Sequence, residues 1–495
     1  MKLLKIIFFS LLVLIVLIFT SCTKFDGYKI MEIDFSGNSG RVSYVDLRYI
    51  NPLNQYSKNV KLKIEFFDEN YNGWRVLTDF LTGKDIFLTD EYGHVSFSFL
   101  PKKGGIYRFR LINLDNSTAP PCEFSVNVKE STWGFLIWLA ADNDLEAYSF
   151  LDLEEMKNQN PDVFVMVMHD KYSSINGKDS LMVLDENGEF KEIQTFNDDV
   201  NSGDEGFLRY VLEQFYSFDF EKGALVIWNH GNGWIDDSKF DLAVSYDFTK
   251  LDALTTKEIR RAIEYVNTGE NKKLELLGFD ACYMGTFEIA YELRNCARYF
   301  VASAFTEPAF GWNYTFMSRL NSDMNIHELA EDIVNSYFEF YSWLGYEGES
   351  LSLGVYDLSH ATGMVEKISA LSEVLTELIE NEKKLKTDII SEYYYQTLNY
   401  YPEEQIIDPL SFLNTLCENT VYQELQDIES DILNVFYGNF LVYKKISTAD
   451  FWNTGLGLFL PTDLDSYQKK LNDMSTLDFY SDTSWKIFLD GLLEQ

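Results

Sequence analysis

Residues 274–282, Leu274-Glu275-Leu276-Leu277-Gly278-Phe279-Asp280-Ala281-Cys282, contain the stretch that decides the fold. Their apolar residues form a continuous run, which is typical of a strand covered on both faces of a parallel sheet. An earlier run, Ala224-Leu225-Val226-Ile227-Trp228-Asn229-His230-Gly231, has the same character. Ligands of open parallel α/β sheets bind outside the carboxyl ends of the strands, so we expect His230 and Cys282 to lie in one crevice.

Strands and helices alternate around these two runs. The expected strands cover 134–141, 163–168 and 299–305, and the expected helices cover 142–157, 206–218, 256–265 and 285–295. The apolar residues in 182–184 and 190–196 indicate a hairpin at the edge of the sheet. This alternation predicts an α/β fold with a mostly parallel sheet and helices on both faces.

The segment that follows the first 21 residues has a different pattern. In residues 60–67 and 95–99 apolar and polar side chains alternate, as in strands that bury one face. Turn-forming pairs such as Gly104-Gly105 and Pro120-Pro121 separate these segments. Residues 22–129 are therefore predicted to form an immunoglobulin-like β-sandwich. This module carries no cluster of catalytic residue types, so we expect it to be a spacer or docking module.

The C-terminal part is predicted to be mainly helical. Aromatic-rich helical stretches are expected at 326–344, 362–399 and 419–438, and an apolar strand is expected at 455–461. We expect a catalytic domain at 130–325 and a helical extension at 326–495 that packs on the catalytic sheet.

The composition disfavours several classes of protein. The chain has 495 residues, of which 46% are hydrophobic and 16% aromatic, and this content indicates large folded cores rather than disorder. The formal net charge of −37 disfavours nucleic acids and anionic membrane surfaces as partners. The acidic side chains are either an ordinary solvated surface or a feature that favours cationic substrates.

The N-terminus has the pattern of a targeting segment. Lys2 and Lys5 precede an apolar run at 6–19, which predicts a signal peptide over residues 1–21. The run ends in Phe19-Thr20-Ser21-Cys22, which is similar to a bacterial lipobox, although Phe19 stands where leucine is usual. We expect Cys22 to be lipidated and the protein to be exported and anchored in the bacterial cell envelope, at the outer membrane or cell surface. Ordinary secretion, with Cys22 uninvolved, is the alternative.

His230 and Cys282 are the residues best suited to catalysis. An imidazole near a thiol raises the thiolate fraction. Gly231 follows the histidine, and glycine lets a backbone N–H approach a reacting carbonyl. A helix expected to begin near Gly285 would lower the pKa of the Cys282 thiol. His169 also ends an apolar strand, but no glycine follows it.

The remaining cysteines do not indicate a metal site or a disulfide framework. The cysteines that follow Cys22 are sparse, and no CxxC pair occurs among Cys122, Cys282, Cys296 and Cys417. We therefore expect mostly free thiols and predict no zinc site and no other metal site.

The segments Trp228-Asn229-His230-Gly231-Asn232-Gly233-Trp234 and Phe279-Asp280-Ala281-Cys282-Tyr283-Met284 resemble the clostripain family of cysteine peptidases, in the caspase-like group. Residues 140–146, 306–312 and 455–461 are also similar to that family, so the resemblance covers about residues 132–494.

The resemblance implies a role for each matching residue. His230 would be the general base and acid, Cys282 the nucleophile, and the N–H groups of Gly231 and Cys282 the oxyanion hole. Asp280 would lie in the floor of the S1 pocket and bind an arginine or lysine, or it would orient the loop through hydrogen bonds. Glu307 and Trp312 would contribute to substrate binding.

One departure from the family concerns specificity. Many relatives carry a second acid where this chain has Ala309-Phe310. A single acid at Asp280 would weaken the binding of a cation, and Phe310 could favour an apolar or mixed P1 residue.

The resemblance also implies regulation. No cofactor is required, but calcium stimulates some members, and self-cleavage occurs after the catalytic histidine. Lys239 and Lys250 are basic cleavage points in that segment.

We therefore expect a cysteine endopeptidase acting on proteins or peptides, with Arg or Lys at P1. The alternative is a non-catalytic surface lipoprotein that binds an envelope or host partner through its β-module. A third interpretation keeps the enzyme but limits its role to self-maturation or to processing neighbouring envelope proteins.

Overall fold

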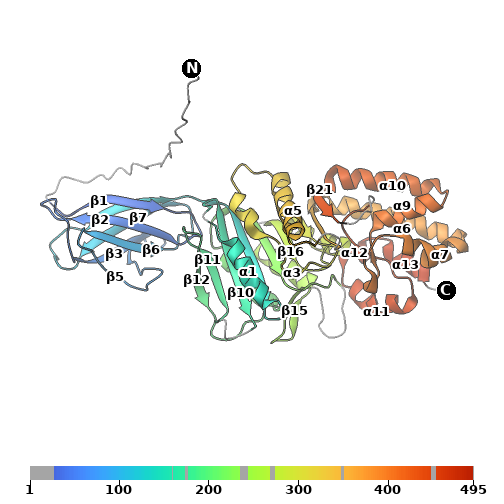
Figure 1. The fold of residues 1–495 in the computed structure, drawn as a ribbon, viewed down its shortest axis with the longest axis horizontal. Coiled ribbons are helices and arrows are strands. Elements are labelled where there is room, and N and C mark those ends of the chain that lie inside the picture. The colour runs from blue at the N-terminus through green and yellow to red at the C-terminus, as the bar shows by residue number, and fades with distance from the viewer. Residues whose placement is uncertain are drawn as a thin grey trace, which may run out of the picture. The chain divides into compact units, whose positions relative to one another are not determined.

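The structure is a computed structural model that describes residues 27–158, 160–172, 177–234, 244–267, 274–346, 350–447 and 453–493. The predicted signal peptide, Cys22 and Lys239 lie outside the described residues. The chain divides into two compact units, with the main break after Lys129 (Figure 1). The smaller unit holds residues up to 37, 43–99 and 104–129, and the larger unit holds the rest.

The smaller unit is a β-sandwich, as predicted. One antiparallel sheet has the order β1 (Lys29–Ser36), β2 (Ser43–Ile50), β6 (His94–Phe99). The other has the order β4 (Gly73–Val76), β3 (Lys61–Asp68), β7 (Gly105–Asn113), β8 (Cys122–Val128), and β5 (Ile86–Leu88) pairs with β3. Side chains of both sheets meet in one core, where the Phe97 and Phe109 rings lie 5.3 Å apart.

The larger unit is built on a nine-stranded sheet. Its order is β12 (Phe190–Thr195), β11 (Ser180–Leu184), β10 (Val163–Lys171), β9 (Ser131–Ala141), β13 (Phe220–Trp228), β16 (Leu274–Asp280), β17 (Ala297–Ala302), β18 (Ser352–Asp357), β21 (Leu441–Ile446). The five central strands, β10, β9, β13, β16 and β17, are parallel to one another. The two pairings at each end of the sheet are antiparallel. The mostly parallel α/β sheet and the hairpin at its edge are confirmed.

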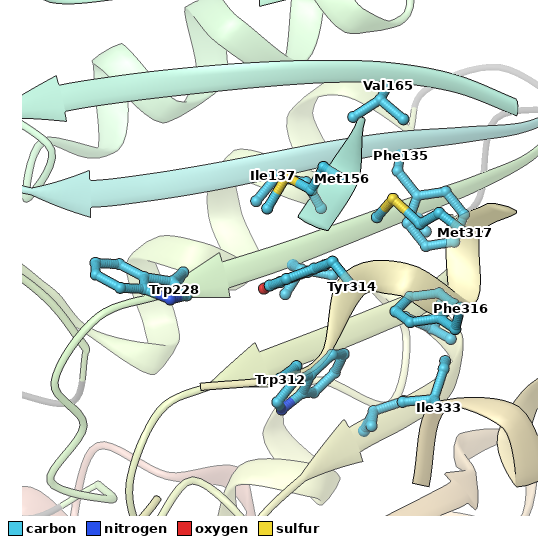
Figure 2. Packing of buried hydrophobic residues seen from close by; sticks show 14 of the residues in the cluster. Phe135, Ile137, Met156, Val165, Trp228, Trp312, Tyr314, Phe316, Met317 and Ile333 are labelled. Atoms are coloured by element: carbon cyan, nitrogen blue, oxygen red, sulfur yellow. The ribbon is translucent and has the colours of Figure 1, made fainter. Parts of the chain in front are cut away.

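Helices cover both faces of this sheet, which explains why the central strands are apolar throughout. Alternate residues of β9 serve opposite faces. Phe135 and Ile137 belong to the core shared with α1 (Glu146–Met156) and α5 (Ile326–Trp343) (Figure 2). Trp138 contacts Phe207 of α2 (Glu205–Phe215), which packs against α3 (Thr256–Val266).

The C-terminal region differs in part from the prediction. After α5, its helices are α6 (Ala361–Asn381), α7 (Lys383–Asp388), α8 (Tyr394–Gln396), α9 (Pro409–Asn419), α10 (Gln423–Val435), α11 (Leu464–Met474), α12 (Asp478–Asp482) and α13 (Trp485–Leu493) in the described part of the chain. The region does more than pack on the sheet, because it supplies β18 and the edge strand β21. The predicted strand at 455–461 is shorter, β22 (Leu458–Phe459), and belongs to a separate sheet with β19 (Asn399–Tyr401) and β20 (Ile406–Ile407). No described helix is both long and apolar enough to cross a membrane.

Residues 38–42 and 100–103 belong to the larger unit although they lie far upstream of β9. Arg41 is 2% exposed, and its guanidinium donates to the carbonyls of Asn158 (2.6 Å), Asn160 (2.9 Å), Val163 (2.9 Å) and Asp185 (2.7 Å). Burial lowers the pKa of Arg41 to about 10. This side chain holds the loop that enters β10 against the turn that follows β11.

Candidate active site

The carboxyl ends of β9, β13 and β16 lie next to one another. Trp228, the last residue of β13, pairs with Leu139 on one side and Asp280 on the other. The strand order reverses here, because β10 lies on one side of β9 and β13 lies on the other. Such a switch point is where open α/β sheets bind ligands. His230 and Cys282 each follow one of these strands by two residues.

Asp144 contacts the imidazole of His230. The distance from its Oδ1 to Nε2 of His230 is 2.7 Å, and both side chains are open to solvent. Asp144 is three residues past the end of β9, and Asn143 before it donates to the carbonyls of Ala140 (2.9 Å) and Tyr246 (3.0 Å). The segment 140–146 was predicted only as a family likeness, so the role of Asp144 was missed.

Gly231 lies against the backbone of the nucleophile. A Cβ atom built on Gly231 would lie 2.3 Å from the carbonyl oxygen of Cys282 and 3.1 Å from its nitrogen. Gly231 also forms a bridge with Val244 of β14 (Val244–Asp247), a strand that the sequence did not predict. Only glycine fits this close approach between the loops that carry the two predicted oxyanion donors.

Cys282 is partly exposed, and the Glu307 N–H donates to its sulfur over 3.2 Å. Burial raises the pKa of the thiol, and the charge of Asp280 raises it further. The expected lowering by a helix is therefore wrong. The helix α4 (Phe287–Glu292) begins five residues after Cys282, with Thr286 as its cap.

Tyr283 continues the loop from Cys282 in a left-handed conformation, with φ of 58°. This conformation is uncommon for a residue with a side chain. The ring of Tyr283 stacks on Tyr401 with centroids 3.8 Å apart and planes 6° from parallel. The Tyr401 hydroxyl donates to Oδ1 of Asn232 over 3.1 Å, so this stack links the loops that follow His230 and Cys282.

A pocket of about 120 Å³ opens between these loops. Its lining consists of Leu145, Trp228, Asn229, His230, Asp280, Ala281, Cys282, Glu307, Pro308, Ala309 and Gly311. The structure therefore brings the predicted residues His230, Asp280, Cys282 and Glu307 to one cavity. Gly231 lies directly behind the loop of Cys282.

Asp280 has the hydrogen bonds to the neighbouring loop that one of the two alternatives predicted, and it also lies at the pocket. It lines the pocket, and its Oδ2 also accepts from the Trp312 N–H (3.0 Å) and the Tyr314 hydroxyl (2.7 Å). Burial raises the pKa of Asp280 to about 6. Burial and the charge of Asp280 raise the pKa of Glu307 well above its usual range. Glu307 thus brings a second carboxyl group to the pocket, and its raised pKa favours the neutral form.

Two further predictions about the 306–312 loop need correction. Trp312 is 1% exposed and its ring packs in the core, near Gly278, rather than in the pocket (Figure 2). It acts through its N–H, which positions Asp280. Phe310 contacts Tyr148 and Phe340 at centroid distances of 5.2 and 6.0 Å and does not line the pocket.

Two more acids lie behind the pocket. Burial raises the pKa of Glu155 to about 7, and it raises the pKa of Asp152 well above the usual range, with the charge of Asp280 adding to both. Glu155 accepts the Tyr314 N–H over 3.0 Å. The raised pKa values favour the neutral forms of both acids.

His169 lies away from this pocket. It is 1% exposed, and its Nε2 lies 2.8 Å from the Ser149 hydroxyl. Burial, with the charge of Lys171, lowers its pKa to about 3, so the ring is neutral. A structural role explains this histidine.

The carboxylates that could hold a metal ion are outside the pocket. Among the described residues, Asp142, Asp170 and Asp199 form a group whose oxygens lie within 4.8 Å of one another. The sequence predicted no metal site, because these residues are separated by about 30 positions and come from different loops.

Comparison with known proteins agrees with this geometry. The family model described as the Clostripain family matches residues 137–491. Clostripain of Hathewaya histolytica is 31% identical over 180 residues, which are 31% of this chain and 34% of that protein. The chain therefore matches about a third of the length of this curated relative.

Solved structures show the same fold. A secreted C11 cysteine protease from Bacteroides thetaiotaomicron, in complex with an irreversible peptide inhibitor, has a TM-score of 0.55 at 18% identity and covers 72% of this chain and 100% of its own. An inactive zymogen C11 protease from Parabacteroides distasonis has a TM-score of 0.54 at 18% identity, with coverage of 71% and 98%. Since the family model spans most of the chain and includes His230 and Cys282, the chain belongs to the clostripain family of cysteine peptidases.

Proposed function

We propose that this chain is a cysteine endopeptidase whose nucleophile is Cys282 and whose base is His230. The observation that carries the proposal is a single pocket lined by both side chains and by the acids Asp280 and Glu307. A thiol, an imidazole and an anionic pocket are the groups that cleavage next to a basic residue requires.

In the proposed reaction the sulfur of Cys282 attacks the scissile carbonyl carbon while His230 takes the thiol proton. Nε2 of His230 faces Asp144, so we assign this proton transfer to Nδ1. The N–H groups of Gly231 and Cys282 stabilise the oxyanion. The C–N bond then breaks, and the amine leaves with the proton from His230. Water, deprotonated by the same imidazole, hydrolyses the thioester and regenerates the thiol.

Two physical arguments support Arg or Lys at P1. A buried carboxylate without a cation is unstable, and a guanidinium or ammonium group would compensate Asp280 and Glu307. The charge of Asp280 also raises the pKa of the Cys282 thiol. A P1 cation would offset that effect, so it should favour thiolate formation as well as binding. A basic P1 residue would thus increase kcat in addition to lowering KM.

The catalytic assignment is tested with Cys282→Ala and a matched variant, Cys417→Ala, which changes a cysteine outside the pocket. We expect Cys282→Ala to abolish cleavage of fluorogenic Arg and Lys peptides and Cys417→Ala to retain it. Activity in a folded Cys282→Ala variant would disprove the assignment.

Specificity is tested with paired peptides that carry arginine or its uncharged analogue citrulline at P1. We expect kcat/KM to be about 100-fold higher or more for arginine, because a buried charge pair is lost in the analogue. Asp280→Asn and Glu307→Gln should each reduce this ratio. An unchanged ratio in both variants would contradict the role of these acids.

We also propose self-cleavage after a basic residue between His230 and α3. Lys239 and Lys250 are the candidates, and Nζ of Lys250 already binds Asp199 over 2.6 Å. Mass spectrometry of wild type and Cys282→Ala should show a cleaved product only in the wild type. Cleavage in both proteins would indicate another protease.

Lipid anchoring at Cys22 in the bacterial cell envelope completes the proposal. The support is the lipobox-like segment Phe19-Thr20-Ser21-Cys22. Metabolic labelling with palmitate should label the wild type and not Cys22→Ser. Equal labelling of both proteins would contradict the anchor.

A further inference from the structure

A groove of about 630 Å³ lies between α5 and the short 3₁₀ helix η2 (Tyr314–Arg319). It is larger than the pocket of about 120 Å³ that Cys282 lines. Its volume falls in the range of sites that bind small ligands, about 300–1,000 Å³. Asn313, Glu339, Phe340 and Trp343 are among its lining residues. The catalytic assignment uses none of these side chains, so the groove is a candidate site for a further contact.

Glu339 and Trp343 form the open part of this groove. They are four residues apart in α5, so their side chains are neighbours on one face of the helix. Trp343 is 79% exposed, and Glu339 is also exposed. The Phe340 ring stacks beside the indole, with centroids 6.4 Å apart and planes 25° from parallel. A carboxylate next to an exposed indole offers an ion pair and a cation–π contact to one guanidinium or ammonium group.

The β-sandwich of the same chain holds an arginine in a couple of this kind. The guanidinium of Arg110 lies 4.6 Å from the ring centroid of Trp74, and its Nη2 lies 2.5 Å from Oε2 of Glu65. Within the described residues, by contrast, no lysine or arginine forms an ion pair with Glu339 or lies over the ring of Trp343. Glu339 and Trp343 thus have the composition of an arginine site that this chain does not fill itself.

The arginine that lines the groove is already engaged. Arg319 donates to Oδ1 of Asp332 through Nη2 over 2.7 Å and to Oδ2 through Nε over 3.0 Å. Its Nη2 also donates to the hydroxyl of Ser336 over 2.6 Å. This pairing compensates Asp332 and leaves Glu339 as the acid that is open to a ligand. With a net charge of −37 on the chain, the groove favours a cationic ligand over an anionic one.

The groove adjoins the pocket of Cys282 through one loop. Gly311 lines the pocket and Asn313 lines the groove, and their Cα atoms lie within about 7.6 Å because only one residue separates them. The hydroxyl of Tyr341 in α5 lies 3.0 Å from the carbonyl oxygen of Pro308 and 2.9 Å from that of Gly311. The helix that carries Glu339 and Trp343 is therefore fixed against the loop that borders the pocket.

A chain of aromatic rings shows how far the groove extends from this loop. The ring of Phe310 lies 6.0 Å from that of Phe340, which lies 6.4 Å from that of Trp343. An extended peptide advances about 3.3 Å per residue. A substrate bound across Phe310 would thus reach Trp343 about four residues further along its chain.

We propose that this groove binds a second arginine or lysine of the substrate, between Glu339 and Trp343, about four to six residues from P1. The inference rests on the proposed function and deepens it. The preferred substrates would be segments that carry two spaced basic residues rather than one. Because the second cation binds away from the scissile bond, it should lower KM and leave kcat nearly unchanged.

The test uses peptides with one arginine at P1 and a second arginine moved one position at a time from P6 to P6′. Citrulline at the same position is the neutral reference, and mass spectrometry identifies the bond that is cleaved. We expect arginine at one or two adjacent positions to lower KM about five- to tenfold, as an exposed ion pair and a cation–π contact allow. Glu339→Gln and Trp343→Ala should each remove most of this gain. Glu331→Gln changes an exposed acid of α5 outside the groove and should retain it.

Two results would overturn the proposal. An equal gain at every position would assign the effect to the overall negative charge, and a gain that survives in both groove variants would place the second cation elsewhere. Titration with the neutral oligosaccharide maltoheptaose tests another occupant of an exposed indole. Saturable binding that is lost in Trp343→Ala, without a positional gain from arginine, would overturn the choice of ligand.

Binding to an inactive protein separates this proposal from the peptidase assignment. In fluorescence anisotropy, Cys282→Ala should bind the labelled peptide with two arginines about five- to tenfold more tightly than its citrulline counterpart. Adding Glu339→Gln to this variant should abolish the difference. Loss of the difference only in the double variant supports the groove whether or not Cys282 is the nucleophile. Cleavage of one-arginine peptides with no benefit from a second arginine would overturn the groove and leave the proposed function intact.

Discussion

Replacing Gly231 with alanine tests the close approach between the two catalytic loops. The added Cβ would lie 2.3 Å from the carbonyl oxygen of Cys282, whereas real Cβ contacts essentially never fall below 3.0 Å. The contact is with backbone, so no flexible side chain can move away. The two loops must separate by about 0.7 Å, and this displaces both N–H groups of the proposed oxyanion hole.

The expected effect on catalysis is large. Misplacement of a reacting group by about 1 Å costs around 100-fold, and loss of one oxyanion donor costs about 100- to 1,000-fold. We therefore expect kcat of Gly231→Ala on an arginine peptide to fall about 100-fold, with KM changed much less. Alkylation of Cys282 by iodoacetamide builds no oxyanion, so its rate should change by only about threefold or less.

Gly363→Ala is the matched control, because a Cβ at Gly363 in α6 would meet no atom within 4 Å. Its kcat should equal that of wild type. Steady-state kinetics, the alkylation rate and circular dichroism of the three proteins together give the answer. If Gly231→Ala remained folded and kept more than a third of the wild-type kcat, the contact between Gly231 and Cys282 would not position the oxyanion donors.

Three further predictions concern pH, His230 and the aromatic stack. Because burial raises the pKa of Asp280 from 3.8 to about 6, its folded form holds a proton that the unfolded chain releases, and its contribution to stability falls as pH rises through this window. The Tm of Asp280→Asn relative to wild type should therefore increase between about pH 4 and 6 and then level off, and calorimetry showing the opposite slope would contradict the raised pKa. Asp144→Asn should lower kcat no more than about fivefold, because its contact with His230 is solvent-exposed. A larger loss in steady-state assays would show that Asp144 does more than orient the ring. Tyr401→Leu should reduce the free energy of unfolding by about 0.5–1.5 kcal/mol through loss of the stack on Tyr283, and urea denaturation with no change would contradict that contribution.

The sequence predicted the parts of the site that depend on buried strands. A continuous apolar run determines where a parallel strand ends, so the positions of His230 and Cys282 at one sheet edge followed from pattern alone. The edge strand β21 was missed because its half-buried residues, including Lys444 and Lys445, lack that pattern. The ends of buried central strands are thus easier to predict than an outermost strand such as β21.

Loop conformations were less accessible to prediction. Glu307 lines the pocket, whereas Trp312 is buried in the core. This difference depends on the path of the 306–312 loop, which the residue types do not specify. The pKa of Cys282 was also predicted in the wrong direction, because burial exceeds the effect of a helix that begins five residues later. Asp142, Asp170 and Asp199 come together from three different loops, and their spacing in the sequence does not predict this.

The buried Arg41 has a consequence for how this protein can be divided or have evolved. Its guanidinium satisfies four carbonyls of the peptidase unit, yet it is encoded upstream of the whole β-sandwich except β1. A fragment that starts at Glu130 would leave those carbonyls without this donor. The N-terminal module therefore cannot be deleted together with residues 38–42 without loss of this donor from the peptidase unit. Exchange of this module between relatives would have to carry the arginine along or replace it with another donor.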